Sequence, residues 1–205
     1  GVSGGGIDID NVVENSVAAA IRGALTVTAG DYLYLEAKET ASVAANATGV
    51  TAAIAAVSLV VGVSLVDNEI NSSITASIGE ANQTGGVVSN PTVNATSITV
   101  KATSVADISQ TDSIAVGGGA VAAVGVNTAN ATVNTTIKAE VIDASLTATV
   151  GDISVTAGSR STALADVDGY VLGFGVGVGV VSAAATVEGR TSASVGGAIT
   201  ADSLM

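Results

Sequence analysis

Internal repetition is the sequence feature that most constrains what this chain can fold into. The letters GVN at 125–127 align with GVS at 62–64, a shift of 63 positions, and with GV at 179–180, a shift of 54 positions. The letters DNEI at 67–70 align with DNVV at 10–13, a shift of 57 positions. Self-similarity at a nearly fixed period is typical of arrays in which each unit packs mainly on its neighbours. We therefore expect a stacked array rather than one thick globular core.

A second anchor, a turn followed by alternating apolar residues, recurs at 30–37, 96–102 and 151–157. Its spacings are 65 and 55 positions, and the longer one is explained by an insert at 82–91 that holds Gly-Gly and the only proline. Such an insert is expected to be a surface loop.

These anchors divide the chain into four units. They are a partial repeat at 1–29, a repeat at 30–94 that includes the insert, a repeat at 95–149, and a truncated repeat at 150–205. Because the pattern stops where the next anchor is due, we expect the chain to be a segment of a longer protein.

The stretch YVLGFGVGVGVV at 170–181 could be read in isolation as a membrane span. Its counterparts in the other repeats lie at 54–66 and 114–126, and the latter carries three consecutive glycines, which disfavour a helix. The letters GFGVGVGV also alternate with period two, as strands do. The repeat comparison therefore predicts strands here, buried ones in which glycine permits close approach of the backbone.

Composition supports the same architecture. The chain of 205 residues is 48% hydrophobic, but it has one Phe, no Trp and three Tyr. Small side chains fill thin, regular layers better than a thick core. Outside the glycine-rich runs, β-branched apolar residues alternate with polar ones, even over 15–22, whose repeat-mates are β-rich. The sequence thus predicts an all-β array of stacked repeats.

Particular stretches resemble repeats of filamentous-haemagglutinin-type and other giant bacterial surface adhesins. LTVTAGDYLYLEA at 25–37 and SLTATVGDISVTAG at 145–158 are similar to their turn-strand units, and the Gly/Ala/Val-rich runs at 117–141 and 173–197 are similar to the segments between them. The resemblance covers essentially the whole chain. It implies an all-β parallel β-helix or β-solenoid stalk that is exported and displayed on the cell surface. The period of 55–65 residues is long for one coil, so two or three coils per repeat, or an added hairpin, are expected.

Charge and missing residue types exclude several functions. The net charge is −12 with six basic residues, which argues against nucleic acid and against anionic membrane surfaces. The absence of His and Cys removes the usual catalytic triads, disulfides and thiolate metal sites. No enzyme activity and no cofactor are expected. A remote alternative is a polysaccharide-acting β-helix enzyme using the pair Asp166 and Asp168.

The acidic residues suggest one candidate metal site. Asp8 and Asp10 align with Asp67 and Glu69 of the next repeat, and oxygen ligands suit Ca²⁺. The alternative is a polar turn without metal.

Asparagine in the pattern Asn-x-Ser/Thr is frequent. These residues are candidates for glycosylation, or for stacked asparagine ladders. They are Asn46, Asn71, Asn82, Asn94, Asn130 and Asn134.

Taken together, these features predict a structural repeat segment, the shaft of a secreted adhesin or extracellular fibre at the cell surface. The alternative is a self-assembling extracellular filament subunit. Self-association, end to end or laterally, is expected because a cut array exposes open strand edges. Host or neighbouring-cell glycans or proteins would be bound by regions outside this segment. No nucleic-acid partner and no transmembrane segment are expected.

Overall fold

The computed structural model describes residues 2–53, 58–80, 90–201 and 203–204. Within these residues every regular element is a strand. The strands are β1 (Val2–Ile21), β2 (Thr26–Thr28), β3 (Tyr32–Ala53), β4 (Leu59–Ile78), β5 (Thr92–Ala95), β6 (Ser97–Gly119), β7 (Ala122–Ala148), β8 (Asp152–Ala163), β9 (Asp166–Gly173), β10 (Val176–Thr200) and β11 (Ser203–Leu204). The predicted all-β class is confirmed.

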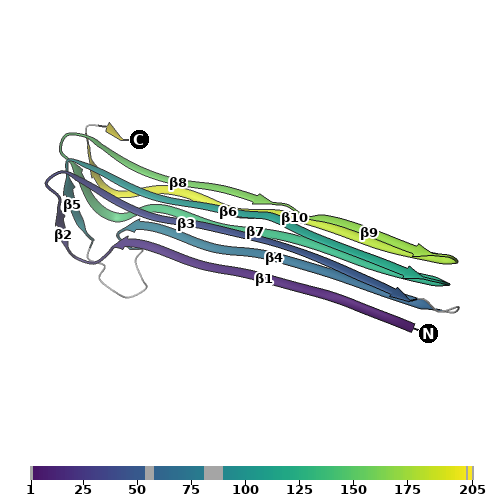
Figure 1. The fold of residues 1–205 in the computed structure, drawn as a ribbon. Coiled ribbons are helices and arrows are strands. Elements are labelled where there is room, and N and C mark those ends of the chain that lie inside the picture. Colours follow the sequence, from purple (N-terminus) through teal and green to yellow (C-terminus); the bar gives the residue numbers. More distant parts are fainter. Residues whose placement is uncertain (1, 54–57, 81–89, 202, 205) are drawn as a thin grey trace.

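The strands form two long sheets that face each other (Figure 1). Sheet A contains β1, β4, β7 and β10 in this order, and sheet B contains β3, β6 and the successive strands β8 and β9. Every strand pair is parallel. The chain runs out along sheet A, crosses a short side formed by β2, β5 and the end of β7, and returns along sheet B. This is a β-solenoid flattened into two layers.

The sequence repeats and the structural coils coincide. Val2 pairs with Leu59, Leu59 with Ala122, and Ala122 with Val176, which reproduces the shifts of 57, 63 and 54 positions. The register predicted from self-similarity is therefore confirmed. The expectation of two or three coils per repeat, or an added hairpin, was wrong. Each repeat is a single coil, and its length comes from strands of 20 residues or more.

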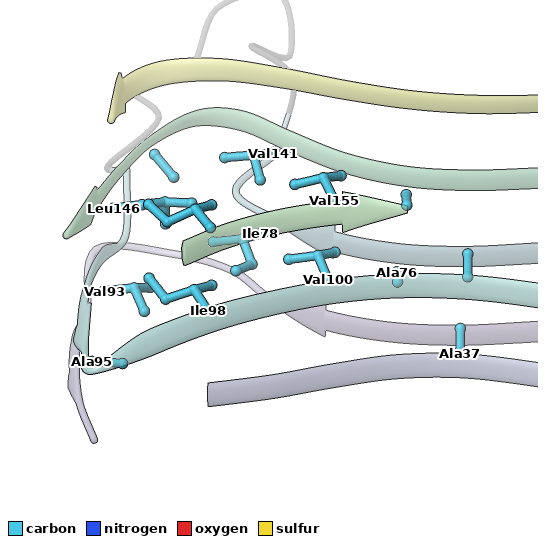
Figure 2. Close-up of a cluster of buried hydrophobic side chains, with 14 of the residues drawn as sticks. Ala37, Ala76, Ile78, Val93, Ala95, Ile98, Val100, Val141, Leu146 and Val155 are labelled. Carbon is cyan, nitrogen blue, oxygen red and sulfur yellow. The ribbon is translucent and has the colours of Figure 1, made fainter. Parts of the chain in front are cut away.

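The main core lies between the sheets, next to the short side. Alternate residues of each long strand point inward, so that Ile78, Ile98 and Leu146 are fully buried (Figure 2). A second cluster farther along the strands includes Ile70 and Ile108. Burying such side chains stabilises the fold by about 1.5–3 kcal/mol each. The coils thus use a few large side chains as well as the small ones that composition suggested.

A column of left-handed residues turns the chain from sheet A onto the short side. Gly23, Gly79, Asp143 and Gly197 have φ values of 83°, 88°, 49° and 108°. A Cβ on Gly79 would lie 1.9 Å from the carbonyl oxygen of Ile142 in the next coil. Glycine is required there by backbone conformation and by space. We call this end of the molecule the corner.

The end of the molecule opposite the corner carries the links from sheet B to sheet A. We call it the tip and define it as residues 2–9, 46–53, 58–66, 112–128 and 168–182. Ser109 is one extra residue in β6, because Val43 pairs with Ile108 while Ala44 pairs with Gln110. The inward positions of β6 therefore change from even to odd numbers between the corner half and the tip.

Two sequence expectations need correction. Pro91, expected in a surface loop, is buried just before β5, and its carbonyl oxygen accepts a hydrogen bond from the Ser145 amide. Most of the insert, 82–89, lies outside the described residues. The stretch 170–181 forms strands as predicted, but it is not buried, since Tyr170, Leu172 and Phe174 are exposed. This stretch belongs to the last coil, and half of its side chains point outward.

Candidate functional site

A buried carboxylate lies between the two sheets. Glu39 of β3 is 5% exposed. Its carboxylate accepts hydrogen bonds from Asn15 Nδ2 at 2.7 Å, Ser72 Oγ at 2.5 Å and Ser104 Oγ at 3.0 Å. These donors come from β1, β4 and β6, so one side chain joins three neighbouring strands. A buried charge is tolerated when hydrogen bonds replace its hydration in this way.

Asparagine residues form a second internal polar layer. Asn11 Nδ2 donates to Asn68 Oδ1 at 2.9 Å, and Asn68 Nδ2 donates to Thr111 Oγ1 of the opposite sheet at 2.7 Å. A third layer pairs Ser113 with Ser64 at 2.9 Å. These polar layers lie inside the molecule, between the two sheets.

These layers fix which residues lie opposite one another. A slip of one residue would reverse every inward side chain and leave the buried donors without partners. A signal was present in the sequence, because Glu39 interrupts the apolar inward series Leu33, Leu35, Ala37, Ala41 and Val43. It shows that position 39 needs polar partners, but not which strands supply them.

The acidic candidates for calcium gather on the outer face of sheet A. Asp10 is the direct ladder partner of Asp67, and Val12 is the partner of Glu69. Partial burial and the negative charges of Asp10, Glu69 and Asp8 raise the pKa of Asp67. Over the residues whose placement is known, no group of three or more carboxylates is arranged to hold a metal ion. A calcium site at these residues stays a prediction, and it rests on the negative charge that the neighbouring carboxylates bring together.

The asparagine candidates for glycosylation occupy strands of the outer surface. Asn71 and Asn134 are ladder partners, as are Asp67 and Asn130. Asn46 is exposed and donates to Asp112 at 3.4 Å, and Asn94 lies on the short side in β5. Asn82 lies outside the described residues. Glycosylation stays a prediction.

The outer surface of the tip is largely apolar. On sheet A, Val176, Val178 and Val180 are exposed, and on sheet B Tyr170 and Leu172 are exposed. The chain contains no charged residue from 113 to 137 or from 169 to 187. The same strands carry charged and hydroxyl side chains on their outer faces toward the corner, such as the Lys101–Glu36 ion pair at 3.3 Å. The sequence pattern alone did not show that these apolar side chains of the tip lie on an outer face.

The interior of the tip is built from small and polar residues. Gly62, Gly125, Ser64 and Asn127 occupy inward positions of sheet A and are buried. A Cβ on Gly62 would lie 2.7 Å from Thr51 Oγ1 of sheet B, so glycine allows the two layers to approach closely. Asn127 donates to the carbonyl oxygen of Asp168 at 2.8 Å, while its own Oδ1 is buried without a partner. The aliphatic side chains inside the tip, such as Val60 and Ala123, are therefore smaller than the isoleucines and leucine that fill the space near the corner.

An apolar groove opens at the far end of the tip. It has a volume of about 500 Å³ and is lined by Ala52, Gly118, Leu172 and Phe174, among others. Phe174 follows β9 and is 99% exposed. It is the only phenylalanine of the chain.

The two carboxylates on which the polysaccharide-acting enzyme hypothesis depends lie at the start of β9. Asp166 and Asp168 are exposed, and Asp166 pairs with Asp112 of β6. Asp166 Oδ1 accepts a hydrogen bond from the Val167 amide at 2.9 Å. The aspartate pair therefore lies on an exposed strand, and its use in catalysis stays a prediction.

The comparisons with known proteins give no relative. No protein-family model, no curated protein and no solved structure matches the chain. In the part of the chain that the structure describes, no helix is long and apolar enough to cross a membrane.

Proposed function

We propose that this chain is a structural repeat segment, the shaft of a secreted bacterial surface adhesin or extracellular fibre. The observation that carries the proposal is the coil-on-coil stacking, in which each strand pairs in parallel with its counterpart one repeat away. Such an array lengthens by adding coils without any change of design. The buried polar layers serve this role because they hold each coil in register with the next.

The first and last coils have free strand edges on which further coils can stack. In the described residues β1 pairs only with β4, and β10 pairs only with β7. Inward-facing Val187 and Val195 of β10 are exposed, whereas their ladder partners Val133 and Val141 in β7 are buried. A further coil would cover these valines and pair the free backbone groups. This favours the second candidate function, a self-assembling filament subunit.

Electron microscopy and sedimentation across concentration separate the two functions. Each strand of about 20 residues spans about 66 Å, so stacked chains should form ribbons of that width. Ribbons that lengthen with concentration would support the filament subunit. A chain that stays monomeric would support a shaft whose edges are covered only by its own neighbouring coils.

A matched pair of variants tests whether the edge of β10 is the contact. Val187→Lys places a charge on an inward position of this edge, and inward charges block edge pairing. Thr186→Lys places the same charge on the outer face one residue away. Stacking should be lost in Val187→Lys and kept in Thr186→Lys. Equal stacking by both variants would contradict an edge-to-edge contact.

A further inference from the structure

The tip carries most of its large apolar side chains outside rather than inside. Its inward positions hold mainly small or polar residues, such as Gly62, Ser64, Gly125 and Asn127, with a few valines such as Val60, whereas many of its outward positions hold valine, leucine, isoleucine or tyrosine. In water, the hydrophobic effect favours large apolar side chains inside. The large apolar side chains of the tip therefore lie where an apolar medium, rather than the protein interior, can surround them.

The apolar surface surrounds the tip on several sides. Val178 and Val180 lie on the outer face of sheet A, Leu172 lies on the outer face of sheet B, and Val121 and Phe174 lie at the links between the sheets. A protein partner usually contacts a molecule from one side. A medium that contacts both outer faces and the end at once fits this distribution better.

The depth of the apolar surface matches one leaflet of a bilayer. From Phe174 to Tyr170 the chain extends four residues, or about 13 Å at about 3.3 Å per residue. Half of a hydrocarbon core of about 30 Å is about 15 Å. Tyr170 would lie near the interface, where tyrosine is enriched, and Asp168 beyond it would stay among the headgroups.

We propose that the tip inserts into one leaflet of a lipid bilayer, with acyl chains against both outer faces and in the apolar groove beside Phe174. The inference goes beyond the structural role and partly rests on it. Unpaired backbone groups are costly in hydrocarbon, so the free edges of the end coils, at β1 and β3 and at β9 and β10, must be paired by further coils or by further copies of the chain. Insertion should therefore increase with the degree of stacking.

A single tryptophan gives a direct test, because the chain has none. Phe174→Trp is mixed with vesicles of neutral phosphatidylcholine, since the charge of −12 disfavours anionic lipid. Insertion should shift the emission to shorter wavelength, and lipids with a quencher in the acyl chain should quench it. Tyr32→Trp, on the outer face of sheet B near the corner, is the matched control and should show neither effect.

Vesicle flotation with a matched pair of double variants tests the energetics. Leu172→Ser with Phe174→Ser should reduce the vesicle-bound fraction at least about tenfold. Tyr32→Ser with Val105→Ser removes exposed apolar area from the corner half of the same sheet and should leave binding unchanged. Circular dichroism checks that both variants keep their strands.

Sedimentation without lipid separates the inference from the proposed stacking. Stacked chains that do not float with vesicles would overturn the inference and leave stacking intact. A blue shift of the Phe174→Trp variant that depends on protein concentration and not on lipid would also overturn it, in favour of contacts between copies. Flotation that increases with stacking would support it.

Discussion

The corner half and the tip of this solenoid share the same strands, the same parallel ladders and the same period, yet they distribute side chains in opposite ways. Near the corner, Ile74 and Ile137 fill the space between the sheets, and charged pairs such as Lys101–Glu36 lie outside. At the tip, Gly62 and Asn127 lie inside, and Val178 and Leu172 lie outside. A sheet pair can therefore continue past the part of its core that is filled by isoleucine and leucine, with smaller inward side chains such as Val60 and with glycine bringing the layers together.

The largest expected effect concerns the turn at the corner. Gly79→Ala places a Cβ 1.9 Å from the carbonyl oxygen of Ile142 at φ 88°, so the backbone must shift. We expect a loss of about 3 kcal/mol or more, a fall in Tm of roughly 6–12 °C for a chain of this size, measured by thermal unfolding. Gly30→Ala is the control, because nothing lies within 4 Å of its Cβ position. Equal losses in both variants would show that the corner is not a special position.

A pair of side-chain truncations tests whether the side chains of the corner half contribute more to stability than the outward side chains of the tip. Ile74→Ala should cost about 2–5 kcal/mol, since this side chain is fully buried among its cluster. Val124→Ala, on the outer face of the tip, should cost no more than about 0.5 kcal/mol in water. Denaturant unfolding measures both. A comparable loss in Val124→Ala would mean that the outward side chains of the tip stabilise the fold as much as the core near the corner does.

Removal of the buried carboxylate tests the role of the polar layer. Glu39→Ala leaves Asn15, Ser72 and Ser104 without their acceptor, which should cost about 1–3 kcal/mol. Glu36→Ala removes a carboxylate from the outer face of the same strand and should change stability little. If Glu39→Ala were as stable as the parent chain, the polar layer would not contribute to the register.

The smallest expected effect is a pH dependence on the outer face of sheet A. The pKa of Asp67 is raised above its usual 3.8, so the folded state binds a proton more readily than the unfolded state. Stability due to this group is therefore present at low pH and falls as pH rises through its folded pKa. Asp67→Asn removes that fall and should be more stable at neutral pH by about 0.5 kcal/mol or less. Thermal unfolding at pH 3 and pH 7 measures it, and a parent chain that gains stability between these values relative to Asp67→Asn would contradict the assignment.

The sequence predicted the fold class and the register, for a physical reason. Stacked coils place the same kind of side chain at the same height, so aligned letters become ladder partners, as Gly62 and Gly125 do. The number of coils per repeat was not predictable in this way, because self-similarity gives the repeat length and not the path of the chain within it.

The sequence alone also did not predict which side chains of the tip point inward and which point outward. An alternation such as GVGVGV states that glycine and valine lie on opposite faces, but not which face is inside. That depends on the opposite sheet, where Val171 faces Gly177 and Gly179. The extra residue Ser109 exchanges the inward positions of β6 and hides the pattern further.

The long strands have a mechanical consequence. Each coil uses 53–66 residues yet adds only about 4.8 Å along the stacking axis, while the cross-section is about 66 Å wide and two sheets thick. Resistance to bending increases steeply with thickness in the direction of the bend. A stack of such coils would therefore resist bending within the plane of its sheets and yield across it. A surface structure built this way would behave as a stiff blade that flexes in one direction, rather than as a cylindrical rod.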